Sequence, residues 1–219
     1  FKKAEMSKPI SLVIFDCDGV LVDSEHLANT LFASICRDLG FPISDEEAME
    51  HFPGNRFSTC VQYVEAKNGR SMPPEILPLF RQQCTEVFAA RLLPIDGMAE
   101  VLNRIKRPKV VASNGPKDKM VENLITCKLI HYFQPDHIFS AYDINKWKPE
   151  PDLFLAAADY MGIAPEECLV IEDSTPGVQA AIAAGMHVVG FTHSMKNKKL
   201  FPLGVPLIHQ PHELYMHLG

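Results

Sequence analysis

The 219-residue sequence lacks the features of a membrane protein, a nucleic-acid-binding protein or a disulfide-rich scaffold. No apolar run approaches the roughly 18 residues that a membrane-spanning helix needs, and the N-terminal region has no signal-peptide core. Lysine and arginine number 21 against 27 acidic residues, so the net charge is -6, whereas a nucleic-acid surface would be basic. We therefore expect neither a membrane nor a nucleic acid as a partner.

Cysteine is sparse, and no two cysteines form a C-x-x-C pair. The six residues are Cys17, Cys36, Cys60, Cys84, Cys127 and Cys168. This spacing argues against a zinc site and a disulfide framework, and it favours small buried side chains in a reducing compartment. We expect a cytoplasmic protein, with Met6 as its natural start and residues 1–5 foreign to it.

Several short apolar runs are present, and each ends in polar or acidic residues. The runs and the residues that follow them are 12–15 with Asp16, 110–112 with Ser113, and 169–171 with Glu172. Continuous apolar runs of this length are typical of strands buried on both faces of a parallel sheet. Ligands bind at the carboxyl ends of such strands, so these polar residues mark the expected site.

Helical patterns separate these runs. They span residues 97–106, 117–129, 152–161 and 178–184. Strands that alternate with helices indicate an α/β fold with a doubly wound, Rossmann-like parallel sheet. The stretch from residue 25 to residue 91 shows helical segments and turns but no convincing buried strand. We therefore predict a core of residues 9–24 and 92–219, with an all-helical domain inserted as residues 25–91.

The first apolar run leads into the segment DCDG at residues 16–19. Residues two apart in an extended segment point the same way, so Asp16 and Asp18 can face one site. Carboxylates this close repel each other and raise a pKa unless a cation lies between them. Glu172 and Asp173 add two more acids at the end of another predicted strand, and ligands that are all oxygen favour Mg²⁺. The sequence therefore predicts a magnesium site.

Two further motifs suit a phosphoryl group. Ser113 and Asn114 lie where a predicted strand turns into a helix, and they offer a hydroxyl and backbone N–H groups to an anion. Lys148 precedes Pro149, which favours an extended conformation, and its charge would neutralise both a phosphate and a carboxylate. Each motif alone is more often a turn, a helix cap or a surface lysine. All four in chain order, three of them at strand ends, favour one catalytic site.

Together these motifs resemble the haloacid dehalogenase-like superfamily of phosphohydrolases, in the branch with a helical cap inserted after the first strand. The segments that carry the resemblance are FDCDGVLVDSE, ASNG, KWKPEPDLF and IEDSTPGVQAAIAAGM. The resemblance covers residues 12–191 and implies a magnesium-dependent phosphatase of small phosphorylated metabolites. Residues 113–149 are similar to bacterial 6-phosphogluconate phosphatases, which share the tryptophan found here at position 147.

The resemblance also implies a role for each motif residue. Asp16 would attack phosphorus and form an aspartyl-phosphate, and Asp18 would protonate the leaving alcohol and then activate a water molecule. Ser113 and Lys148 would hold the phosphoryl oxygens. The implied magnesium ligands are the Asp16 carboxylate, the Asp18 backbone carbonyl, Asp173 and, directly or through water, Glu172.

The cap implied by the resemblance, residues 25–91, would close over the site and select the substrate. In the cap, Arg56 would pair with a carboxylate or a second phosphate of the substrate, although a solvated turn explains its position equally well. The expected phosphate- and substrate-binding residues are Cys17, Gly19, Ser113, Asn114, Lys148 and Arg56. The expected partner is a phosphorylated sugar, with 6-phosphogluconate as one candidate, and the expected state is a monomer or small homo-oligomer.

Two other functions stay open. A sugar phosphomutase of the β-phosphoglucomutase type shares the core and cap, but its pattern has a histidine twelve residues after the nucleophile, where this sequence has Ala28. A non-enzymatic protein of the same fold would be expected to have lost at least one motif, and all four are intact. Dehalogenases lack the second aspartate, so Asp18 argues against that reaction.

Overall fold

The structure is a computed structural model of the chain, and it describes residues 9–52, 57–192 and 200–219. The chain divides into two compact units. The first comprises Phe1–Val22 and Pro94–Gly219, and the second is Asp23–Leu93. Residues 25–91, predicted as the inserted helical domain, fall inside the second unit. Met6 and Arg56, which were singled out in the sequence, lie outside the described residues.

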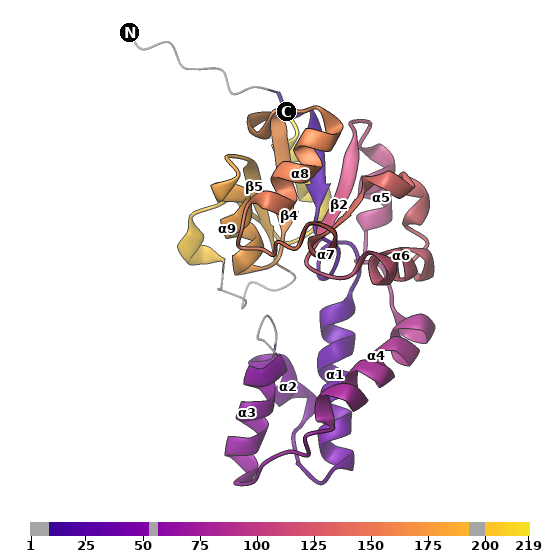
Figure 1. Cartoon of the computed structure of the whole chain (residues 1–219), viewed down its shortest axis with the longest axis vertical. Coiled ribbons are helices and arrows are strands. Elements are labelled where there is room, and N and C mark those ends of the chain that lie inside the picture. The colour runs from indigo at the N-terminus through magenta and orange to yellow at the C-terminus, as the bar shows by residue number, and fades with distance from the viewer. Residues whose placement is uncertain (1–8, 53–56, 193–199) are drawn as a thin grey trace. The chain divides into compact units, whose positions relative to one another are not determined.

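The first unit contains a six-stranded parallel sheet, which confirms the predicted fold class (Figure 1). Its strands are β1 (Leu12–Phe15), β2 (Lys109–Ser113), β3 (Ile138–Ser140), β4 (Cys168–Glu172), β5 (His187–Phe191) and β6 (Leu207–Ile208). The order across the sheet is β3-β2-β1-β4-β5-β6. The three strands predicted from the sequence, β1, β2 and β4, are therefore neighbours, and β1 lies between the other two.

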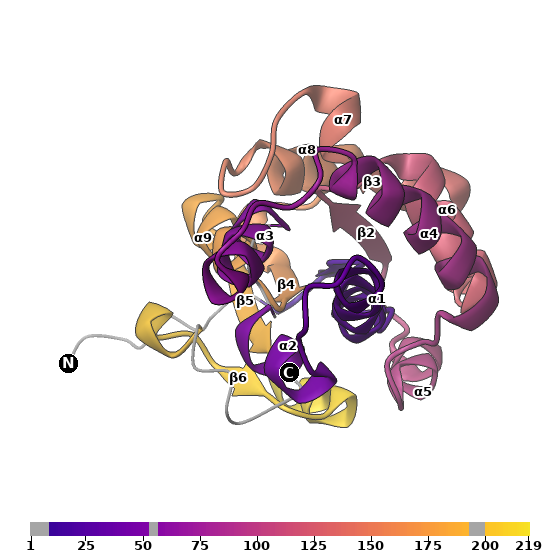
Figure 2. The ribbon, with the colours of Figure 1, turned by 90° about the horizontal axis from the view of Figure 1, so that it is seen from below.

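Helices cover both sides of this sheet. They are α5 (Met98–Arg104), α6 (Lys117–Thr126), α7 (Ala141–Ile144), α8 (Asp152–Met161) and α9 (Thr175–Ala183). Short 3-10 helices follow at Ile130–Tyr132, Pro135–His137, Pro165–Glu167, Phe201–Leu203 and Pro211–His217. Figure 2 shows α8 and α9 on one side of the sheet and α5 and α6 on the other. The doubly wound arrangement predicted from the alternating pattern is thus observed.

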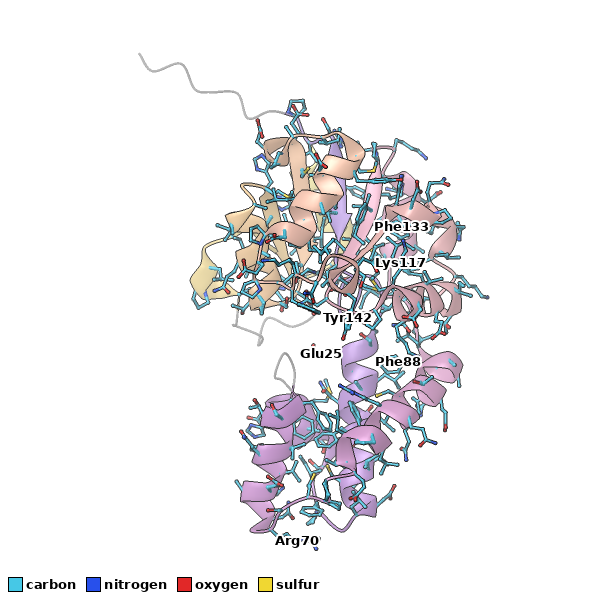
Figure 3. All side chains as sticks on the ribbon, in the orientation of Figure 1. Glu25, Arg70, Phe88, Lys117, Phe133 and Tyr142 are labelled. Atoms are coloured by element: carbon cyan, nitrogen blue, oxygen red, sulfur yellow. The ribbon has the colours of Figure 1, made fainter. Side chains whose placement is uncertain are left out.

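The two faces of β1 pack into different parts of the core, because successive strand residues point to opposite sides. Leu12 and Ile14 are fully buried in a cluster with side chains of α8 and α9, such as Phe154 and Val178. Phe15 points the other way and packs edge-on against Phe133, labelled in Figure 3, with ring centroids 6.4 Å apart. Burial on both faces explains why the run preceding Asp16 is continuously apolar.

The described residues of the second unit form helices joined by turns and loops, and they include no strand. Its helices are α1 (Ser24–Asp38), α2 (Asp45–His51), α3 (Phe57–Asn68) and α4 (Ile76–Arg91). They share a buried cluster in which the ring of Phe32 lies 5.3 Å from Phe52 and 5.6 Å from Phe80. Ser44 caps α2 by accepting a hydrogen bond from the Glu47 N–H at 3.1 Å. Among all described helices, none combines the length and apolar character that crossing a membrane requires.

Candidate active site

Asp16 directly follows β1 at the centre of the sheet. Its backbone N–H still donates to the Ile171 carbonyl at 3.0 Å, so Asp16 extends the ladder between β1 and β4. The chain then turns, because the N–H groups of Leu21 and Val22 both donate to the Cys17 carbonyl, at 2.9 and 3.1 Å. This turn holds the Asp16 side chain, which is only 7% exposed, at the carboxyl edge of the sheet.

The turn gives the next three residues different environments. Cys17 is fully buried, and burial raises the pKa of its thiol, which keeps the thiol protonated and unreactive. Asp18 is exposed. Gly19 has a φ of +79°, and a Cβ on it would lie 2.0 Å from Oδ2 of Asp173. Both the positive φ and the closeness of Asp173 require glycine at this position. Because glycine has no side chain, Asp173 can approach the loop that carries Asp18.

Lys148 is the central cation of the site. Its Nζ donates to Asp16 Oδ1 at 2.5 Å, to Glu172 Oε1 at 2.5 Å and to the Ala112 carbonyl at 2.9 Å, which uses all three ammonium protons. Burial by itself lowers the pKa of Lys148, but the carboxylates of Asp16 and Glu172 outweigh that effect and raise it. Lys148 therefore stays protonated. Its three hydrogen bonds connect β2, β4 and the residue that follows β1.

The acidic residues outnumber this cation. Asp16, Glu172 and Asp173 each offer a carboxylate oxygen, and these oxygens all lie within 4.8 Å of one another. Burial raises the pKa of Asp16, Lys148 opposes the rise, and Glu172 adds to it. A divalent cation would relieve this repulsion, and a donor set made only of oxygen fits magnesium. Three of the four predicted metal ligands, Asp16, Glu172 and Asp173, thus lie together in the fold.

Glu172 is completely buried at the end of β4, and both of its carboxylate oxygens are hydrogen-bonded. Oε1 accepts from Lys148, while Oε2 accepts from the backbone N–H of Ser174 at 3.0 Å and from its Oγ at 2.8 Å. Ser174 was not assigned to the site from the sequence. It caps α9 by accepting a hydrogen bond from the Gly177 N–H at 3.1 Å, in addition to its contact with Glu172.

Gly177 also determines where Glu172 can lie. A Cβ on Gly177 would lie 1.9 Å from both Cδ and Oε1 of Glu172. The backbone of Gly177 lies outside the left-handed region, so this steric clash alone requires glycine at the position. We expect Gly177→Ala to displace the Glu172 carboxylate, to lower catalytic activity at least about tenfold and to cost about 1–3 kcal/mol of stability. Steady-state kinetics and thermal unfolding measure the two effects.

The matched control for this substitution is Gly69→Ala. Gly69 has a φ of +65° and no atom within 4 Å of a built Cβ, so alanine there introduces backbone strain without a steric clash. We expect it to lower stability and leave catalytic activity unchanged. Normal activity in Gly177→Ala would contradict the requirement for a glycine beside Glu172.

The loop after β2 brings Ser113 and Asp18 to the same place. The buried Ser113 Oγ accepts a hydrogen bond from the Gly115 N–H at 3.2 Å. A Cβ on Gly115 would lie 3.6 Å from Ser113 Oγ and 4.0 Å from Asp18 Oδ2, so both polar groups border this glycine. Ser140 lies at the end of β3, a strand that was not predicted. Its hydroxyl donates to the Gly115 carbonyl at 2.7 Å and so holds the loop that follows β2.

Asn114, one of the predicted phosphate-binding residues, contacts the backbone of Lys148. Its Oδ1 accepts from the Lys148 backbone N–H at 2.9 Å, and its Nδ2 donates to the Lys148 carbonyl at 3.4 Å. Its amide therefore holds the segment that carries Lys148. Trp147, the preceding residue, is 40% exposed and lies edge-on to Tyr142 with ring centroids 5.6 Å apart; Tyr142 is labelled in Figure 3.

Comparison with known proteins agrees with this geometry. The family model described as haloacid dehalogenase-like hydrolase matches residues 13–191. The 6-phosphogluconate phosphatase of Escherichia coli (strain K12) is 34% identical over 211 residues, which cover 96% of this chain and 92% of that protein.

Two solved structures are also similar to this chain. A conserved haloacid dehalogenase-like protein of unknown function from Agrobacterium tumefaciens str. C58 is 33% identical, with a TM-score of 0.86 and coverage of 95% of this chain and 97% of that one. A hydrolase from Deinococcus radiodurans R1, with bound phosphate and sodium, is 29% identical, with a TM-score of 0.84 and coverage of 96% and 95%.

Proposed function

This chain belongs to the haloacid dehalogenase-like hydrolases and is a phosphoric monoester hydrolase, and on that premise we propose that it hydrolyses phosphorylated sugars with magnesium as cofactor and Asp16 as nucleophile. The observation that carries the proposal is the buried Asp16–Lys148–Glu172 cluster at the carboxyl edge of the sheet, with Asp173 beside it. A buried carboxylate bonded to an ammonium suits attack on an anionic phosphoryl group, because the cation offsets the repulsion between the two.

In the first proposed step, a carboxylate oxygen of Asp16 attacks phosphorus. The bond from phosphorus to the substrate alcohol breaks, and the departing oxygen takes the proton of the Asp18 carboxyl group. The product is an aspartyl-phosphate on Asp16 together with the free alcohol. Ser113 would hold a phosphoryl oxygen through its hydroxyl, and Lys148 would attract the phosphoryl oxygens through its positive charge at the Asp16 carboxylate.

In the second proposed step, water hydrolyses the aspartyl-phosphate. The Asp18 carboxylate takes a proton from the water, whose oxygen attacks phosphorus while the bond to Asp16 breaks. Inorganic phosphate leaves, and both carboxyl groups return to their initial protonation states. The exposure of Asp18 supports this role, because an exposed group can meet both the leaving alcohol and the incoming water.

Magnesium, when bound, supplies orientation of the phosphoryl group and neutralisation of its negative charge. Asp16 and Asp173 would hold it through carboxylates, Asp18 through its backbone carbonyl, and Glu172 directly or through water. The close approach of the Gly19 turn to Asp173 supports this set, since it places the loop of Asp18 beside that carboxylate. The backbone of Cys17 and Gly19 and the loop of Asn114 would line the phosphate.

The substrate class rests on similarity and on the proposed cap. The E. coli relative is named for 6-phosphogluconate, which makes that sugar-acid phosphate the first candidate. We propose that residues 25–91 form the cap that selects the substrate. Arg56, which lies outside the described residues, is proposed to pair with the carboxylate of such a substrate.

The test is phosphate release from a panel of sugar and organic-acid phosphates that includes 6-phosphogluconate. We expect activity with magnesium to exceed activity in EDTA by about 100-fold or more, because an absent divalent cation leaves the carboxylates repelling the substrate. If the folded protein with magnesium releases phosphate from no member of the panel, the proposed phosphatase activity is excluded. Isomer interconversion that needs a bisphosphate activator and releases little phosphate would establish a mutase instead.

A further inference from the structure

Ser174 contacts both the buried acid Glu172 and the first turn of α9. We propose that Ser174 is a positioning residue for the reaction: its hydroxyl holds Glu172 in the orientation that bonds Lys148. The inference rests on the proposed function, since it concerns the same reaction. It assigns to Ser174 a role beyond helix capping and links α9 to the geometry of the nucleophile.

Donors on both sides hold the Glu172 carboxylate. The backbone N–H and the Oγ of Ser174 both donate to Oε2, at 3.0 and 2.8 Å, while Lys148 donates to Oε1 at 2.5 Å. Hydrogen bonds at both oxygens fix the rotation of the carboxylate group as well as its position. Removing the Ser174 hydroxyl leaves Oε2 with a single backbone donor and so weakens the restraint on the rotation of the carboxylate.

The Ser174 hydroxyl can accept one hydrogen bond and donate another at the same time. Ser174 Oγ accepts the Gly177 N–H at 3.1 Å, and it is the N-cap of α9. A hydroxyl has one proton, and the contact with Gly177 needs only a lone pair. The proton is therefore available to Glu172, and the first turn of α9 holds the oxygen in place. Capping and positioning use different parts of the same hydroxyl.

The contact between Ser174 and Glu172 is connected to the nucleophile. Glu172 bonds Lys148, and Lys148 bonds Asp16, with both contacts at 2.5 Å and all three residues buried. A rotated Glu172 would change the direction of the Lys148 ammonium and hence the charge beside Asp16. Hydrogen-bonding partners behind a metal ligand typically change activity or metal affinity by about 10–100-fold when they are removed.

The test compares Ser174→Ala, Ser174→Thr and Ser44→Ala in the full chain. We expect Ser174→Ala to lower kcat about tenfold with KM changed less than about twofold, because the contact acts on the reacting groups rather than on substrate binding. Ser174→Thr keeps a hydroxyl and should keep kcat within about threefold of the parent. Ser44→Ala removes the equivalent cap of α2 and should leave kcat unchanged.

Crystal structures of the two Ser174 variants give a readout that needs no activity. We expect the contact between Lys148 Nζ and Glu172 to be lost or lengthened in Ser174→Ala and retained in Ser174→Thr. An unmoved Glu172 with unchanged kcat in Ser174→Ala would overturn the inference, as would equal loss of kcat in Ser44→Ala. If the parent releases no phosphate, the proposed function fails, while the crystal structures still decide whether Ser174 orients Glu172.

Discussion

Asp16→Asn is expected to lower kcat by about 10,000-fold or more while the protein stays folded. Asparagine has nearly the same shape, and its side-chain oxygen can still accept the hydrogen bond from Lys148 Nζ. It lacks the negative charge and nucleophilicity of the carboxylate, so no aspartyl-phosphate can form. Phosphate release with the best substrate of the panel, at saturating magnesium, measures the effect.

The same substitution should not destabilise the metal-free protein. Burial raises the pKa of Asp16 above its ordinary value of 3.8, against the opposing effect of Lys148. Because the folded state then holds this proton more tightly than the unfolded chain, ionising Asp16 costs stability as the pH rises above that value. A neutral asparagine removes the cost, so the melting temperature near neutral pH should be equal or higher.

Asp159→Asn is the matched control for this prediction. Asp159 is an exposed residue of α8, and asparagine there should change neither activity nor stability. Residual activity of Asp16→Asn above about one hundredth of the parent would contradict the nucleophile assignment. Loss of the folded state would instead show that the Asp16 charge is needed for folding.

Lys148→Met has the second-largest expected effect, and it should appear in both activity and stability. Methionine replaces the stem but leaves Asp16 and Glu172 buried without their cation. Removing one partner of a buried ion pair typically costs about 3–5 kcal/mol, and we expect a loss of that size here. Loss of the charge that faces the phosphoryl group should lower kcat about 1,000-fold.

The stability loss should depend on pH in a defined direction. The ammonium of Lys148 opposes the raised pKa of Asp16, so its removal raises that pKa further. The folded variant then binds a proton that the unfolded chain has released, and stability falls as the pH rises above about 4. Denaturant unfolding at pH 5 and pH 8 should show the larger loss at pH 8.

Two further variants make the Lys148 prediction specific. Lys148→Met combined with Glu172→Gln removes one of the two unpaired acids, and it should recover part of the stability but none of the activity. Lys106→Met removes an exposed lysine before the amino end of β2, whereas the site lies at the carboxyl ends of the strands. This control should change neither stability nor activity. Equal stability of Lys148→Met and the parent at pH 8 would contradict the buried ion pair.

Local pattern was enough to predict the central elements of the fold. The runs that precede Asp16, Ser113 and Glu172 became β1, β2 and β4, because burial on both faces of a parallel sheet demands continuous apolar residues. The helix predicted at residues 152–161 has the same bounds as α8. The family of the chain followed from the same motifs, and the match over residues 13–191 agrees.

Other elements were missed because the chain signals them weakly. The strands β3 and β6 have only three and two residues, too few for a periodic pattern. The strand β5 contains Gly190, and glycine has a low propensity for strands. A Cβ on Gly190 would lie 2.5 Å from a side-chain atom of Leu207 in β6, so the close packing of the two strands requires glycine there. Helix α6 ends at Thr126, before the predicted residue 129, and Lys128 follows with a φ of +56°.

The sequence by itself determined which residue types stand at the strand ends, and therefore the class of chemistry. Only the tertiary structure decided which atoms meet: Lys148 reaches Asp16 across 132 residues of chain, and Asn114 holds the backbone of Lys148. The physical reason is that strand order places β1 between β2 and β4. Side-chain contacts across those strands depend on packing in three dimensions, which no local pattern encodes.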